Sequence, residues 1–106
     1  MSFTGNEGDY ITLTQASAYT AAYRAANPGA TKGHFLGATK LKALLNQSGC
    51  VGLRSYYAIN TSTGEKQLVV VGVDSNENDI VGGSALILDK SLLCPPNCGV
   101  ANGLNS

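Results

Sequence analysis

The hydrophobic periodicity of the chain changes at Gly49, and this change limits the folds that are available. Before Gly49, apolar residues recur every three to four positions, which is typical of amphipathic helices. After it, apolar and polar residues alternate, which is typical of strands. A chain of 106 residues is too short for two independent cores. The order of elements therefore predicts a single α+β domain over residues 1–106, with two N-terminal helices packed on a three-stranded, mainly antiparallel sheet.

The first helix is expected to begin at Thr12 and to end before Pro28. The sequence from Thr12 to Gln15 matches a capping box, in which the two outer side chains each bind a backbone amide. Alanines and tyrosines then recur at helical spacing over residues 16–26. The proline pushes the backbone of Asn27 out of the helical region, so the helix should stop there.

A second helix is predicted through residues 40–47, with leucines on its inner face. Phe35 and Ala38 extend this apolar face backward, so the helix start is expected somewhere within residues 31–38. Gly49 stands where a left-handed C-terminal cap belongs.

Three strands are expected in the second half of the chain. Residues 51–59 alternate in polarity and residues 67–73 are rich in β-branched side chains, so the two should form an antiparallel hairpin. Residues 83–89 are predicted to form the third strand. The ends of the chain are expected to be irregular, with a loose arm at residues 1–10 and a tail at residues 94–106.

Two observations indicate an interface between copies of the chain. Leu68 and Val70 point away from Val69 and Val71, so the middle strand is apolar on both faces. Charged residues make up 13% of the chain, about half the usual share, and leave little to cover a second apolar face. Large exposed apolar patches are typical of interfaces. We therefore expect a homodimer that a charge placed at Val70 would weaken.

The charge of the chain is balanced in total but uneven along its length. Seven basic and seven acidic residues give a formal net charge of zero, which excludes a general electrostatic attraction to nucleic acid or to a membrane surface. No apolar run approaches the ~18 residues of a membrane span. The stretch from Tyr10 to Gly64 has basic residues and no acidic ones. This basic half either faces the acidic second half or holds an anion.

Four residues of the basic half are candidates for binding an anion. They are Lys32, His34, Lys40 and Arg54. A doubled tetrapeptide, at residues 29–32 and 37–40, places glycine, a hydroxyl and lysine near a helix start, where a phosphate or carboxylate could be held. The pattern lacks the Gly-Lys-Ser/Thr ending of a P-loop. The alternative interpretation is a solvent-exposed helix N-terminus that binds no ligand. The sequence does not identify a small-molecule ligand.

The polar loop at residues 74–79 has some of the spacing of a calcium-binding loop. Its oxygen-bearing residues include Asp74, Asn76, Asn78 and Asp79. In a calcium loop the sixth position is glycine and the twelfth is glutamate, but here they are Asp79 and Ala85. We therefore expect a hairpin loop whose side chains bind their own backbone, with no calcium binding tighter than about a millimolar.

The three cysteines are Cys50, Cys94 and Cys98. An odd number, with no basic and apolar leader at the start, favours reduced thiols in the cytoplasm. Cys50 is expected to be buried and inert, whereas Cys94 and Cys98 should be ordinary exposed thiols that lie close enough to oxidise to each other. Two alternatives stay open. One is a regulatory disulfide, and the other is a zinc site that uses the three cysteines with His34.

Three segments have a specific pattern: GCVGLRSYYA at residues 49–58, VGVDSNENDI at residues 71–80, and CPPNC at residues 94–98. Together they resemble a group of small uncharacterised bacterial proteins of about this length, with the resemblance extending from Ile11 onward. It implies that the whole chain is the natural protein, and it implies no activity, cofactor or partner.

The function favoured by these patterns is a non-enzymatic binding or interaction module that acts as a homodimer and needs no cofactor. Nucleophilic and acid–base catalysis have little support, because the chain has one histidine and its carboxylates cluster in a loop that should be exposed. The alternative is a small thiol-based enzyme, or a redox or zinc sensor, that uses Cys94 and Cys98 and possibly Cys50 with His34.

Overall fold

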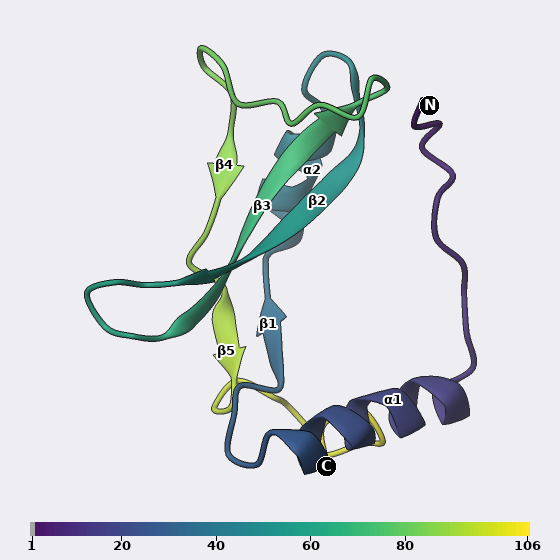
Figure 1. The fold of residues 1–106 in the computed structure, drawn as a ribbon, viewed down its shortest axis with the longest axis vertical. Helices are drawn as coiled ribbons and strands as arrows, with labels where there is room; N and C mark the ends of the chain where they lie inside the picture. Colours follow the sequence, from purple (N-terminus) through teal and green to yellow (C-terminus); the bar gives the residue numbers. More distant parts are fainter. Residues whose placement is uncertain (1) are drawn as a thin grey trace. The chain divides into compact units, whose positions relative to one another are not determined.

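The computed structural model describes residues 2–106 and contains two compact units. The first unit comprises the chain up to Glu7 together with Leu36–Ser91. The second comprises Gly8–Phe35 together with Leu92–Ser106. Figure 1 labels the helices and strands of both units. Their composition confirms the predicted α+β class, with two helices and antiparallel sheets in the described residues.

The first unit is built on a three-stranded antiparallel sheet in the order β2-β3-β4 (Figure 1). Strand β2 spans Cys50–Ile59, β3 spans Lys66–Asp74, and β4 spans only Ile87–Leu88. The β2–β3 hairpin is the one that the alternating pattern predicts. Its register is regular from Gly52 to Ile59, and a bulge lies between Cys50 and Gly52.

Helix α2, Ala38–Leu45, packs against β2 and β3. Leu44 on this helix is 1% exposed and is the most deeply buried side chain of the core. At Gly72 of β3 a Cβ atom would lie 2.8 Å from Gln47 Nε2 and 2.9 Å from Cys50 Sγ, so a side chain does not fit there. Gln47 lies two residues beyond the end of α2, and α2 contacts β3, so the face that carries Gly72 is the one beside α2.

Strand β3 is buried on both faces within this unit, which corrects the expected position of the interface. Val70 and Val71 point to opposite faces, yet each is only 3% exposed. A charge at Val70 would therefore disrupt the core under α2 instead of an interface. The exposed apolar side chains of the sheet lie on β2 and β4.

The second unit combines helix α1, Leu13–Ala26, with a two-stranded antiparallel sheet. This sheet pairs β1, Gly33–Phe35, with β5, Leu92–Cys94. The predicted capping box is confirmed, because the Thr12 side chain accepts from the Gln15 amide and the Gln15 side chain accepts from the Thr12 amide.

The C-terminal tail is irregular, as expected, but it is held against other parts of the second unit. Arg24 Nη1 donates to the Leu104 carbonyl at 2.7 Å, and Lys32 Nζ donates to the Asn105 carbonyl at 2.8 Å. Gly103 lies so close to Ser17 of α1 that a Cβ atom would be 2.3 Å from its Oγ. The sequence did not indicate these contacts, since the acceptors are backbone carbonyls.

Several element bounds differ from the expected ones. Phe35 lies in β1 and does not extend the second helix, which begins at Ala38 and ends at Leu45. Gly49 has the expected positive φ of 79°, but it lies in the turn before β2 because Asn46 is the C-cap. The third strand is shorter than predicted, since a turn closes between Gly82 and Ala85 before it begins.

The N-terminal arm has no regular secondary structure, and its residues 3–7 are nevertheless ordered by contacts within the first unit. The Phe3 amide donates to the Ser75 carbonyl at 2.9 Å. Gly5 lies beside β2, where a Cβ atom would be 3.1 Å from the Val51 carbonyl oxygen. Met1, the first residue of the predicted arm, lies outside the described residues. Neither α1 nor α2 is long and apolar enough to cross a membrane, and residues 2–106 contain no other helix.

Candidate functional site

The outer side of β2 is the longest unpaired sheet edge in residues 2–106. Strand β2 stands at the end of the sheet order, so its inner side pairs with β3 and its outer side pairs with no other strand. We call the outer side of residues 53–59 the β2 edge. An unpaired edge of this length presents a row of backbone donors and acceptors that another strand can use.

Large apolar and aromatic side chains of the β2 edge are exposed. Tyr57 is 96% exposed and Ile59 is 64% exposed. Leu53 and Tyr56 are less exposed, at 37% and 44%. The strand contains no proline and no lysine, the residues that natural proteins place on edges to prevent pairing. The β2 edge is therefore chemically suited to pair with another strand.

The opposite end of the same sheet is protected from pairing. Strand β4 has only two residues, and Asp89 and Lys90 follow it directly. Lys90 has a φ of 64°, which turns the chain out of the extended conformation. A short, charged and bent strand is a poor template for another chain. The two edges of the sheet thus differ in what they can bind.

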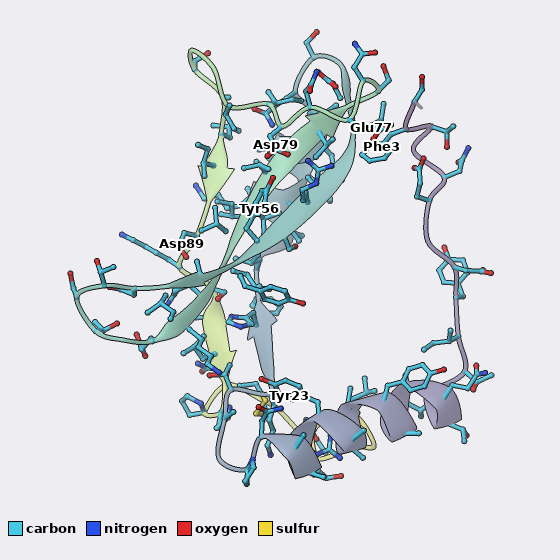
Figure 2. The ribbon with its side chains drawn as sticks, in the orientation of Figure 1. Phe3, Tyr23, Tyr56, Glu77, Asp79 and Asp89 are labelled. Carbon is cyan, nitrogen blue, oxygen red and sulfur yellow. A yellow bond between two sulfur atoms is a disulfide. The ribbon has the colours of Figure 1, made fainter. Side chains whose placement is uncertain are left out.

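The single charged side chain of β2 is neutralised within the first unit. Arg54 Nη1 lies 2.5 Å from Asp79 Oδ1, and the Tyr56 hydroxyl donates to Asp79 Oδ2 (Figure 2). Interactions with Tyr56 and then with Asp79 raise the pKa of Arg54, which stays charged. Arg54 therefore already forms an ion pair with a carboxylate of the same unit.

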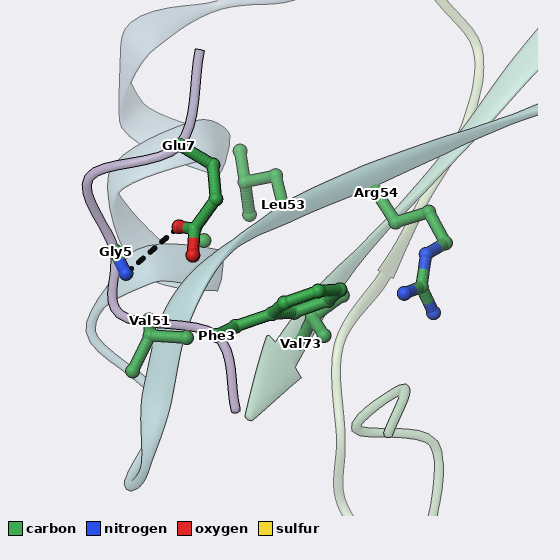
Figure 3. Close-up of a pocket in the computed structure, with 8 residues that line it drawn as sticks. Phe3, Gly5, Glu7, Val51, Leu53, Arg54 and Val73 are labelled. Atoms are coloured by element: carbon green, nitrogen blue, oxygen red, sulfur yellow. Dashed lines mark hydrogen bonds between the residues drawn. The ribbon is translucent and has the colours of Figure 1, made fainter. Parts of the chain in front are cut away.

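A pocket of about 330 Å³ lies between the N-terminal arm and β2 (Figure 3). The Phe3 ring forms one wall, with the Arg54 guanidinium 5.8 Å from the ring centroid. Glu7 also lines the pocket, but its carboxylate accepts from the Thr4 and Gly5 amides at 2.8 and 2.9 Å. The Thr4 amide is the largest cause that lowers the pKa of Glu7. Both charged groups of the pocket are thus bound internally.

A second pocket of about 390 Å³ lies between α2 and the segment around β4. Its floor is apolar and includes Leu44, and its lining includes Lys40, Asp89 and Lys90. The pocket places one of the predicted anion-binding residues beside a second lysine. A carboxylate lies in the same lining, so the pocket is not purely basic.

The structure does not assemble the four predicted anion-binding residues in either unit. Lys32 and His34 belong to the second unit, whereas Lys40 and Arg54 belong to the first. The Lys32 ammonium binds the Asn105 carbonyl, and His34 pairs with Leu93 in the β1–β5 sheet.

The polar loop uses its side chains to hold its own backbone. Asp74 Oδ1 accepts from the Asn76 amide at 2.9 Å and from the Asn78 amide at 3.0 Å. Asp79 binds Arg54 and Tyr56 instead of the loop. These contacts engage Asp74 Oδ1 and both carboxylate oxygens of Asp79, three of the oxygens that the spacing of the loop suggested for a cation.

Cys94 and Cys98 form a disulfide, so the expectation of two ordinary free thiols is wrong. The turn that follows β5 brings their Cα atoms to 4.7 Å, within the range that a disulfide spans. Cys50 is free and half-buried, and its Sγ lies 3.2 Å from the Gly52 carbonyl oxygen. Within residues 2–106, no three His, Cys, Asp or Glu side chains are grouped so that they could hold a metal ion.

Sequence reasoning missed Tyr56, Asp79 as an ion-pair partner, and Phe3. A signal for the first two existed, because Arg54 and Tyr56 are two residues apart and so lie on one face of a strand. An acidic residue in the loop after the adjacent strand is a natural partner for that face. No sequence signal placed Phe3, since the arm has no periodicity.

Comparisons with family models, with curated proteins and with solved structures found no match to this chain.

Proposed function

We propose that the chain is a non-enzymatic interaction module that works as a homodimer, with the β2 edge as its interface. The observation that carries the proposal is the contrast between the two ends of one sheet. The β2 edge is long, apolar and without lysine or proline, whereas β4 is two residues long and is followed by charged residues. Such a surface favours pairing with another strand over contact with water.

A second copy of the chain fits this edge by charge. Arg54 is the only charged residue within β2, and its charge is already paired with Asp79 of the same copy. Two β2 edges can therefore approach each other without an unpaired charge on either side. An isologous contact of this kind closes after two copies.

Light scattering tests the proposal on the intact protein. We expect about twice 10.9 kDa at micromolar concentration. Tyr57→Lys should shift the mass toward that of the monomer, because it places a lysine on the edge. Tyr10→Lys is the matched control, since Tyr10 is equally exposed, at 98%, and lies outside the strands. A monomer for the unaltered protein at high concentration, or equal effects of the two variants, would overturn the proposal.

A second candidate function, redox sensing, is favoured by the Cys94–Cys98 disulfide. An external dithiol would supply two electrons and two protons, and would convert the disulfide into two thiols while itself becoming a disulfide. The disulfide also favours an oxidising compartment over the cytoplasm. A redox titration in glutathione buffers would support a sensor if the pair exchanged within the range of cellular glutathione potentials and if reduction changed the assembly of the protein.

A further inference from the structure

We propose that the two copies pair through antiparallel β2 strands in one register, with Tyr56 of one copy opposite Tyr56 of the other. This inference rests on the proposed homodimer and goes beyond it by naming the partner residue of each position. It follows from the direction of the backbone groups along β2 and from the part of the edge that the arm covers.

The hairpin turn determines which residues of β2 direct their backbone groups outward. The Asn60 amide donates to the Glu65 carbonyl at 2.8 Å, so Asn60 and Glu65 form a hydrogen-bonded pair. Hydrogen-bonded and non-hydrogen-bonded pairs alternate along an antiparallel ladder. Even-numbered residues of β2 from 52 to 58 therefore bind β3. Odd-numbered residues direct their amides and carbonyls to the unpaired side.

A contact outside the hairpin agrees with this alternation. The Gly72 carbonyl of β3 accepts from the Ile80 amide on the side away from β2. Gly72 is opposite Leu53, an odd-numbered residue, so this pair is not hydrogen-bonded within the hairpin. The Val51 carbonyl lies beside Gly5 of the arm, at the bulge that begins the strand.

The arm restricts the length of the edge that a partner can use. Because Gly5 lies against the Val51 carbonyl, the outer side of Val51 is covered. Beyond Val51, the residues with outward backbone groups are Leu53, Ser55, Tyr57 and Ile59, of which Leu53 lines the pocket beside the arm. Their midpoint along the strand is residue 56.

A two-fold axis at residue 56 uses all four of these residues in both copies. Leu53 then pairs with Ile59 of the second copy, and Ser55 pairs with Tyr57. An axis at Ser55 would place Ile59 opposite Val51, where the arm already lies. An axis at Arg54 would leave Ile59 unpaired and would place Tyr57 opposite Val51, where the arm already lies.

The side chains match in this register on both faces of the joined sheet. On the face that α2 covers in each copy, Leu53 of one copy packs against Ile59 of the other. Each of these exposed apolar side chains is then buried by its partner. On the other face the two Tyr56 rings lie opposite each other, and Arg54 lies opposite Ala58. Aromatic and apolar cross-strand pairs each contribute about 0.2–1 kcal/mol, so the register is favoured by side chains as well as by backbone.

The size of the contact predicts a weak dimer. Seven residues of each copy take part, compared with roughly 20–30 on each side of a standard stable interface. We therefore expect the mass to fall toward that of the monomer on dilution below micromolar concentrations.

A cysteine scan across the proposed axis tests the register. In a Cys50→Ser background no other free thiol is present, because Cys94 and Cys98 are joined. Single variants Arg54→Cys, Ser55→Cys, Tyr56→Cys and Tyr57→Cys are oxidised in a glutathione buffer, and the cross-linked dimer is measured on non-reducing gels. Cysteines directly opposite have Cβ atoms about 4.5–5.5 Å apart, whereas diagonal ones are about 7–8 Å apart.

Tyr56→Cys should form the cross-linked dimer on the order of tenfold faster than Ser55→Cys and Tyr57→Cys. Arg54→Cys should form it slowest. Fastest cross-linking at 54, 55 or 57 overturns the register and leaves the homodimer standing. If the mass is that of a dimer but no position cross-links, the β2 edge is not the interface, and the homodimer itself still stands. A monomeric mass for the unaltered protein overturns the homodimer itself.

A second pair of variants tests the backbone contact without a new cysteine. Ser55→Pro removes an outward amide, which a strand at a sheet edge tolerates in the monomer. Ser55→Ala keeps that amide and is the matched control. We expect Ser55→Pro to be monomeric with an unchanged circular dichroism spectrum and Ser55→Ala to stay dimeric. A dimeric and folded Ser55→Pro protein would contradict the pairing.

Discussion

The two units of the chain are held together by different means. All four buried hydrophobic side chains of residues 2–106 lie in the first unit, and they are Leu44, Val70, Val71 and Val73. In the second unit, helix α1 has no buried residue. That unit is held by a disulfide, by strand pairing and by side chains that bind backbone carbonyls of the tail.

This difference shows that a short chain can combine a small apolar core with a cross-linked segment. Apolar burial stabilises in proportion to the area removed from water, and deleting a buried side chain leaves a cavity. A disulfide acts mainly by restricting the unfolded chain. The two units should therefore respond differently to core mutation, reduction and acid.

The largest effect is expected from Leu44→Ala. Leu44 is 1% exposed between α2 and the sheet, so its truncation should cost about 2–5 kcal/mol of unfolding free energy. Chemical denaturation would measure the loss, and hydrogen exchange would show reduced protection of the β2 and β3 amides.

Leu13→Ala on α1 is the matched control for this change. Leu13 is 64% exposed, so its truncation should change the unfolding free energy by only about 0.5 kcal/mol or less. Equal losses from the two leucines would contradict the conclusion that the apolar core lies in the first unit.

The elements with a local signal were predictable from the sequence. The capping box at Thr12 and the proline after Asn27 mark the ends of α1 because both act on the adjacent backbone. The β2–β3 hairpin was predictable because its alternation, its β-branched residues and its turn all agree.

Elements that depend on distant partners were not predictable. Strand β1 exists because it pairs with β5, about sixty residues away, and three residues carry too little periodicity to indicate a strand. The third strand was predicted too long, because the Leu86 amide binds the Gln47 side chain instead of a strand. Nothing local to either segment indicates its partner.

The candidate site was predictable only in part. An apolar surface for a second copy was expected from the low charge, but it was placed on β3. Both faces of β3 are buried within the first unit, so the exposed apolar side chains of the sheet are those of its neighbours β2 and β4. Which strand stands at the end of a sheet follows from pairing order, and a single sequence does not give that order.

An intermediate effect is expected when the disulfide is removed. The bond joins residues four apart, and closing so short a loop accounts for about 2 kcal/mol in the chain-entropy model. In a Cys94→Ser, Cys98→Ser variant, hydrogen exchange should accelerate at the amides of β1 and β5 and stay unchanged at β2 and β3. The unaltered protein in dithiol buffer is the parallel measurement. Loss of protection in the hairpin of the first unit would show that the bond stabilises both units.

The smallest effect is expected from acid acting on the N-terminal arm. Hydrogen bonds from the Thr4 and Gly5 amides lower the pKa of Glu7 in the folded chain, relative to its ordinary value of 4.5. Because the pKa of Glu7 is lower in the folded chain than in the unfolded chain, the ionised carboxylate stabilises the arm at pH values above the unfolded pKa. This stabilisation is lost as the pH falls through the folded pKa. The Gly5 amide resonance should therefore shift with a midpoint below 4.5, and in Glu7→Gln this transition should disappear. A midpoint at or above the ordinary glutamate value would mean that the turn at residues 4–7 does not form in solution.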